Sequence, residues 1–70
     1  PTLIAQGTAD TTVPETATNA LVSALCAKGT PITYDTYAGA DHRGSVAASL
    51  PDVQAFVAAR LAGVTPATTC

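Results

Sequence analysis

A stretch near the start of the chain decides its fold: Thr2-Leu3-Ile4-Ala5-Gln6-Gly7-Thr8-Ala9-Asp10-Thr11-Thr12-Val13-Pro14. Its first residues are apolar without polar alternation, which predicts a short strand over residues 2–6 that is buried on both faces. Residues 7–12 are rich in turn-forming types and predict a loop. Val13-Pro14-Glu15 then predicts a helix start, because proline suits the first turn and an acid suits the positive end of the helix dipole.

The segments that follow predict one helix and one further strand. Apolar residues recur at helical spacing as far as Cys26, and Lys28-Gly29 is typical of a helix end, so we expect a helix over residues 14–28. Residues 31–37 alternate apolar or aromatic with polar side chains and include β-branched types. That pattern predicts a second strand, half-buried in the fold.

The last part of the chain predicts a loop, a short helical turn and a second helix. We expect the loop over residues 38–44 and the turn over residues 45–49. Ser49-Leu50-Pro51-Asp52 is typical of a capped helix start with proline in the first turn, which places the second helix over residues 51–62. Gly63 ends this helix, and residues 63–70 form a tail. The apolar stripe that we expect to face the core consists of Val53, Phe56, Val57 and Leu61.

The order strand, helix, strand, helix indicates an α/β fold. A strand joined to the next strand by a helix pairs in parallel, with a right-handed crossover. Parallel sheets are normally covered on both faces and contain more than two strands. We therefore predict a small parallel β-α-β-α unit at the edge of a larger sheet, with residues 1–70 as one segment of a domain. The chain begins at Pro1, directly before a strand and without an initiator methionine, so we expect a piece of a longer protein.

Composition and charge narrow the classes of function. The chain is 47% hydrophobic and 11% charged, which argues against disorder. The net charge is −2, and the three basic residues do not cluster, so we expect no nucleic-acid partner. No apolar run approaches the ~18 residues of a membrane-spanning helix. A chain this short buries too small a core to be stable without a disulfide, a partner or the rest of a larger protein.

The two cysteines, Cys26 and Cys70, indicate the redox compartment. One interpretation is a buried helical thiol and a free thiol at the chain end, which would be exposed and reactive. The other is a Cys26–Cys70 disulfide that anchors the C-terminus. We expect the disulfide, and with it an extracellular or periplasmic location.

Asp10 and His42 are the residues that best suit catalysis. Each follows a predicted strand, and the carboxyl ends of neighbouring parallel strands meet at one rim of the sheet. There the Asp10 carboxylate could orient the imidazole of His42, the only histidine, as a general base. The alternative for each residue is a plain loop role: Asp10 as a turn or cap residue and His42 as a solvated side chain.

The motifs around these two residues resemble those of α/β-hydrolases. Residues 1–14 look like the strand that delivers the acid of that fold, an apolar run leading into Gly-x-x-Asp and then Val-Pro. Tyr37-Ala38-Gly39-Ala40-Asp41-His42 is similar to the segment that delivers its histidine. Together with Cys26 and Cys70, residues 1–62 most resemble the secretory lipase family.

That resemblance implies a secreted carboxylic ester hydrolase, a lipase or esterase acting on esters or acylglycerols. It implies Asp10 as the acid and His42 as the base of a Ser-His-Asp triad. It implies neither a cofactor nor a metal ion. The unit would be the C-terminal edge of an α/β-hydrolase sheet, completed by the remainder of the hydrolase or by a second copy of the chain.

The nucleophile of the family is missing from the sequence. No Gly-x-Ser-x-Gly elbow is present, and the serines are Ser23, Ser45 and Ser49. Ser45 follows His42 by one helical turn and is the candidate for a substitute nucleophile, although a serine there is also a typical helix N-cap. Asp41 is interpreted as a solvated loop acid. The alternatives to a lipase segment are therefore a non-catalytic folded fragment and a minimal esterase that uses Ser45.

Overall fold

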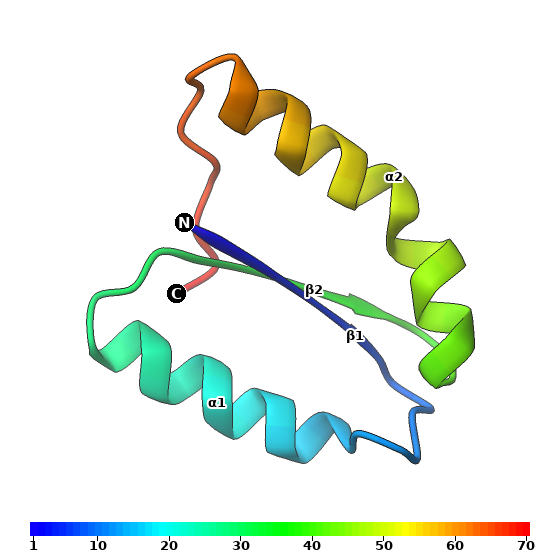
Figure 1. The fold of residues 1–70 in the computed structure, drawn as a ribbon. Helices are drawn as coiled ribbons and strands as arrows, with labels where there is room; N and C mark the ends of the chain where they lie inside the picture. Colours follow the sequence, from blue (N-terminus) through cyan, green and yellow to red (C-terminus); the bar gives the residue numbers. More distant parts are fainter.

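The computed structural model describes residues 1–70 and contains four elements. They are β1 (Thr2–Gly7), α1 (Glu15–Ala27), β2 (Ile32–Tyr37) and α2 (His42–Leu61). Figure 1 shows the two helices on opposite sides of the two strands. The predicted α/β unit, with its strand, helix, strand, helix order, is confirmed.

The two strands form a parallel pair, as the crossover rule predicts. Their register runs from Thr2 opposite Ile32 to Gly7 opposite Tyr37. The pairing continues past the end of β1, where the Thr8 N–H donates to the Tyr37 carbonyl at 3.0 Å. Because the strands run in the same direction and end together, the loops that follow them lie at one rim of the sheet.

Helix α1 has the ends that its sequence predicts. It begins after Pro14, with Glu15 in its first turn. At its other end, the Gly29 N–H donates to the Cys26 carbonyl at 3.0 Å and the Thr30 N–H donates to the Leu25 carbonyl at 3.1 Å. These two bonds satisfy carbonyls that the helix leaves without partners.

Helix α2 differs from the prediction, because residues 42–61 form one helix and not a turn followed by a second helix. It begins at His42 because the Asp41 side chain caps it, accepting a hydrogen bond from the Gly44 N–H at 2.6 Å. Pro51 therefore lies inside the helix and not at its start. Proline removes one intrahelical donor and bends a helix, and α2 is visibly bent along its length (Figure 1). The predicted loop over residues 38–44 is correspondingly shorter.

Two tyrosines attach the helices to β2. The Tyr34 hydroxyl donates to the side-chain oxygen of Asn19 in α1 at 2.7 Å. The Tyr37 hydroxyl donates to Oδ2 of Asp52 in α2 at 2.6 Å. Burial raises the pKa of Tyr37 above its ordinary value, and the hydrogen bond to Asp52 raises it further. The phenol therefore stays protonated and keeps donating at neutral pH.

The apolar stripe of α2, which we expected to face the core, is largely exposed, and α1 exposes apolar side chains as well. Ile32 is the one fully buried apolar residue. Leu21 of α1 is 52% exposed, and Val57 and Leu61 of α2 are 49% and 85% exposed. The prediction is wrong because a sheet of two strands is too narrow to cover the apolar faces of both helices. No helix has the length and apolarity needed to cross a membrane.

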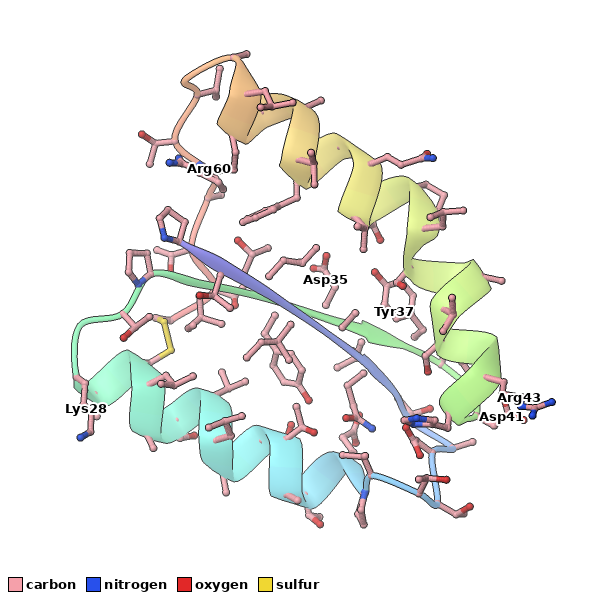
Figure 2. All side chains as sticks on the ribbon, in the orientation of Figure 1. Lys28, Asp35, Tyr37, Asp41, Arg43 and Arg60 are labelled. Carbon is pink, nitrogen blue, oxygen red and sulfur yellow. A yellow bond between two sulfur atoms is a disulfide. The ribbon has the colours of Figure 1, made fainter.

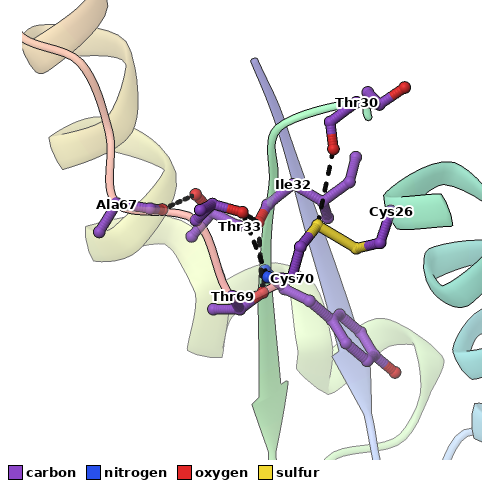
Figure 3. Close-up of a disulfide and its surroundings, with 9 residues drawn as sticks. Cys26, Thr30, Ile32, Thr33, Ala67, Thr69 and Cys70 are labelled. Atoms are coloured by element: carbon purple, nitrogen blue, oxygen red, sulfur yellow. Dashed lines mark hydrogen bonds between the residues drawn. A yellow bond between two sulfur atoms is a disulfide. The ribbon is translucent and has the colours of Figure 1, made fainter. Parts of the chain in front are cut away.

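The predicted Cys26–Cys70 disulfide is confirmed, with 5.4 Å between the two Cα atoms. It holds the chain end against the outer edge of β2 (Figure 3). There the Thr69 N–H donates to the Ile32 carbonyl at 2.8 Å, and the Thr33 hydroxyl donates to the Ala67 carbonyl at 2.7 Å. The tail thus covers one edge of the sheet, while the outer edge of β1 has no neighbouring strand.

Candidate functional site

Asp10 and His42 meet at the rim where both strands end. Asp10 lies in the loop after β1, and His42 is the first residue of α2. Asp10 Oδ2 lies 2.8 Å from His42 Nδ1. The Asp10 side chain is only 4% exposed, whereas the His42 side chain is 56% exposed. The carboxylate is therefore enclosed by protein while the imidazole remains accessible from solvent.

The second oxygen of Asp10 is held by its own loop. Oδ1 accepts hydrogen bonds from the N–H groups of Thr12 and Val13, each at 2.8 Å. The Val13 N–H lowers the pKa of Asp10 most, and the bonds from His42 and Thr12 lower it further, outweighing the opposite effect of burial. Asp10 is therefore a carboxylate at neutral pH. Because a carboxylate only accepts hydrogen bonds, Nδ1 of His42 is the donor in this contact, and Nε2 is the ring nitrogen that is not bonded to Asp10.

Gln6 forms a buried polar link behind this loop, a role that the sequence analysis missed. The residue is 4% exposed at the end of β1. Its Nε2 donates to the carbonyl oxygens of Val13 at 2.8 Å and Gly7 at 2.9 Å. Its Oε1 accepts from the hydroxyl of Thr18 in α1 at 2.6 Å. The available signal was a polar residue at the end of an otherwise apolar strand.

The two rim loops are in direct contact because position 7 is glycine. A Cβ atom there would overlap the carbonyl oxygen of Ala40 and the hydroxyl of Ser45. Next to it, the Ala9 N–H donates to the Ala40 carbonyl at 3.0 Å. The Gly39 N–H donates to the Thr8 hydroxyl at 2.8 Å. These contacts fix the distance between the loop that carries Asp10 and the helix that carries His42.

Asp41 and Ser45 have different structural roles from those expected. Asp41, interpreted as a solvated loop acid, is the N-cap of α2. Ser45, for which we considered an N-cap role, lies inside the helix. Its hydroxyl donates to the Asp41 carbonyl at 2.6 Å, and no hydrogen bond joins it to His42. The capping prediction for Ser45 is wrong because the aspartate four residues earlier already caps the helix.

A hollow of about 370 Å³ lies beside the dyad. Asp10, His42 and Ser45 line it. Its apolar lining comes from β1, the Asp10 loop and both helices, in the residues Ile4, Ala5, Val13, Leu21 and Val46. An apolar space next to a base suits a substrate with a hydrocarbon part.

Charged side chains are sparse and dispersed around this site. Figure 2 shows Arg43 projecting outward from the start of α2, while Lys28 and Arg60 lie at the far ends of the two helices. No three side chains among histidine, cysteine, aspartate and glutamate lie close enough together to share a metal ion.

The arrangement places an ionised carboxylate against an imidazole that it can orient, a geometry that suits a general base. Comparison of the chain with protein-family models, curated proteins and solved structures found no match.

Proposed function

We propose that this chain supplies the acid and the general base of a serine-dependent carboxylic ester hydrolase of the secretory lipase kind. In this proposal the β-α-β-α unit is the C-terminal edge of an α/β-hydrolase sheet. The observation that carries the proposal is the 2.8 Å contact between Asp10 and His42 at the carboxyl ends of adjacent parallel strands. The sequence motifs around both residues support the same assignment.

The reaction would follow the serine hydrolase scheme. His42 Nε2 takes the proton of a serine hydroxyl as the serine oxygen bonds to the ester carbonyl carbon. Asp10 stabilises the resulting imidazolium. His42 then returns the proton to the alcohol as the ester C–O bond breaks, leaving an acyl-serine. Water, deprotonated by the same imidazole, releases the carboxylic acid and restores the serine. The apolar hollow beside His42 suits the acyl chain of an ester or acylglycerol.

The serine would come from a further part of the sheet. The tail covers the outer edge of β2, but no strand neighbours the outer edge of β1. The hollow that contains His42 also opens beside β1, which lines it with Ile4 and Ala5. A strand added at this edge would form a further wall of the hollow, in which Leu21 and Val46, now exposed, would remain as lining. We assign this place to the remainder of the hydrolase, with a second copy of the chain as the alternative partner.

The disulfide supports a secreted location for the proposed enzyme. Disulfides persist in oxidising compartments and are rare in the cytosol. The Cys26–Cys70 bond closes a small domain whose core contains a single fully buried apolar residue. A bond of this kind is a common means of stabilising small extracellular domains.

The proposal is tested by ester hydrolysis in the complete protein that contains this chain. His42→Ala should abolish turnover. Asp10→Asn should lower kcat by about 10⁴-fold, because an amide can hold the wrong imidazole tautomer and does not stabilise the imidazolium. Asp52→Asn is the matched control, since it makes the same chemical change outside the dyad and should leave turnover intact. Full turnover in both the His42 and the Asp10 variants would contradict the proposal.

Ser45 supports a second candidate, a minimal esterase formed by the chain alone. It lines the same hollow as His42, although its hydroxyl donates to the Asp41 carbonyl. A phosphonate probe distinguishes the candidates, because it labels only an activated serine. Labelling of Ser45 that disappears in His42→Ala would establish the minimal esterase. An unlabelled 70-residue chain is expected if the serine lies elsewhere, or if the chain is a non-catalytic fragment.

A further inference from the structure

The buried amide of Gln6 is attached to the dyad through the backbone of a single residue, Val13. Val13 uses both of its backbone polar groups: its carbonyl accepts from Gln6 Nε2, and its N–H donates to Asp10 Oδ1, each at 2.8 Å. Asp10 then contacts His42 through its other oxygen. Hydrogen bonds on the two sides of the Val13 Cα therefore connect the interior of β1, through this one residue and Asp10, to the exposed imidazole.

The orientation of the Gln6 amide follows from the chemistry of its partners. Two of them are the carbonyl oxygens of Gly7 and Val13, which only accept hydrogen bonds. Nε2 must therefore face them, since the reverse orientation would place Oε1 against both carbonyl oxygens. Thr18, itself 8% exposed, completes the set by donating to Oε1. Only a neutral amide of this length provides two donors on one side and an acceptor on the other.

We propose that Gln6, held by Thr18, is a positioning residue that fixes the backbone of Val13 and thereby aims the Asp10 carboxylate at His42. This inference rests on the proposed function, in which the Asp10–His42 pair is the acid and base of the hydrolase. Gln6 and Thr18 also line the hollow, but no hydrogen bond joins Gln6 to His42, so any effect of Gln6 on the imidazole passes through Val13. Without the Gln6 donors, the loop over residues 8–14 loses the side-chain hydrogen bond that connects it to the interior of β1.

The test removes the donors while keeping shape and charge. Gln6→Met replaces the amide by a neutral side chain of similar length, and Gln54→Met makes the same change on the exposed surface of α2. The pKa of Asp10 is followed in the 70-residue chain through the ¹³C shift of its carboxyl group. We expect this pKa to rise toward the ordinary aspartate value in Gln6→Met, because the Val13 N–H no longer holds Oδ1. It should be unchanged in Gln54→Met.

Amide hydrogen exchange gives a second, local measurement. The Val13 N–H should exchange about tenfold faster in Gln6→Met, the equivalent of one lost hydrogen bond. Amides in the second half of α2 serve as the reference for global unfolding. Thr18→Val keeps the Gln6 donors but removes the partner of Oε1, so it should shift both readouts in the same direction by a smaller amount. It also provides the test if Gln6→Met does not fold.

The outcomes separate this inference from the proposed function. An unchanged Asp10 pKa and unchanged Val13 exchange in folded Gln6→Met or Thr18→Val would overturn the positioning role, whatever the hydrolysis results. If both readouts shift while the complete protein hydrolyses no ester, the positioning role stands and the hydrolase proposal fails. Loss of stability without either local shift would make Gln6 a purely structural residue.

Discussion

The two ends of the small sheet are held together by different means. Where β2 begins, the tail runs along the strand, and a covalent Cys26–Cys70 bond closes the arrangement. Where the strands end, there is no covalent link. The rim there depends on side-chain hydrogen bonds and on the close approach that Gly7 permits. The covalent constraint is thus at one end and the candidate chemistry at the other.

This difference suggests that the two ends respond independently to mutation. A change at the disulfide should alter the free energy of unfolding and leave the dyad geometry of the folded molecule intact. A change at the rim should disturb the dyad even where it costs little stability. The two ends are separated by almost the length of β2, and their contacts share no residues. We therefore expect the effects of mutations at the two ends on the free energy of unfolding to be additive.

The largest effect is expected from removing the disulfide. Replacing both Cys26 and Cys70 by serine frees a loop with a sequence separation of 44, worth up to about 4 kcal/mol in the chain-entropy account. Urea unfolding should show this loss as a lower midpoint. The low-field NMR signal of the His42 Nδ1 proton should persist in the fraction that remains folded. Its disappearance from the folded fraction would show that the two ends are coupled.

The next largest effect is expected at Gly7. In Gly7→Ala, the new methyl group meets the Ala40 carbonyl, which is backbone and cannot move aside without shifting the loop. We expect a loss of roughly 1–3 kcal/mol, typical of overpacking, together with loss of the His42 Nδ1 proton signal. Gly63→Ala is the matched control. Its backbone at φ 74° is also strained by a side chain, but it lies far from the rim. An intact signal in Gly7→Ala would mean that the close approach does not position the dyad.

A smaller effect is expected at the helix cap. Asp41→Ala removes the acceptor for the Gly44 N–H and should cost about 1 kcal/mol, or about 4–8 °C in melting temperature for a domain of this size. Asp41→Asn should retain most of the stability, since asparagine caps helices as well as aspartate does. Equal melting temperatures for the alanine and asparagine variants would show that the cap contributes little.

The smallest effect on stability is expected from lowering the pH. The pKa of Asp10 is lower in the folded protein than its ordinary value, so Asp10 stabilises the fold above that ordinary value. This contribution is lost as the pH falls through the lowered pKa. Unfolding measured between about pH 6 and pH 2 should therefore show a stability gap between the wild type and Asp10→Asn that narrows on acidification. A gap independent of pH would assign the difference to packing and not to ionisation.

Much of the fold could be predicted because its signals are local. The apolar residues Leu3, Ile4 and Ala5 predict β1. Pro14 and Gly29 mark the two ends of α1. The start of α2 was misplaced because two local signals compete there. Pro51 is typical of a first helical turn, but Asp41 caps the helix earlier, and a single interior proline does not prevent its continuation.

Only the part of the site that depends on the order of strands and helices could be predicted from the sequence. The crossover rule brings the loops of Asp10 and His42 to one rim, so their proximity followed from the order of elements. The role of Gln6 could not be predicted in this way. Its partners are Val13 in the loop after β1 and Thr18 in α1, and the order of elements does not specify which side chains meet there. Periodicity also identified the apolar stripes without revealing that two strands leave them exposed. A pattern shows which side chains favour burial, not how wide a sheet is available to cover them.

The disulfide also determines how the molecule would carry a mechanical load. Cys70 is bonded to Cys26, so residues 27–69 form a closed ring that a force applied at Pro1 and Cys70 bypasses. Pulling on the oxidised chain can extend only residues 1–26, roughly 90 Å of contour length, against roughly 240 Å after reduction. The extensible segment contains β1 and Asp10, while His42 stays inside the ring. Tension would therefore separate Asp10 from His42, while β2 and α2 remain within the ring that the disulfide closes.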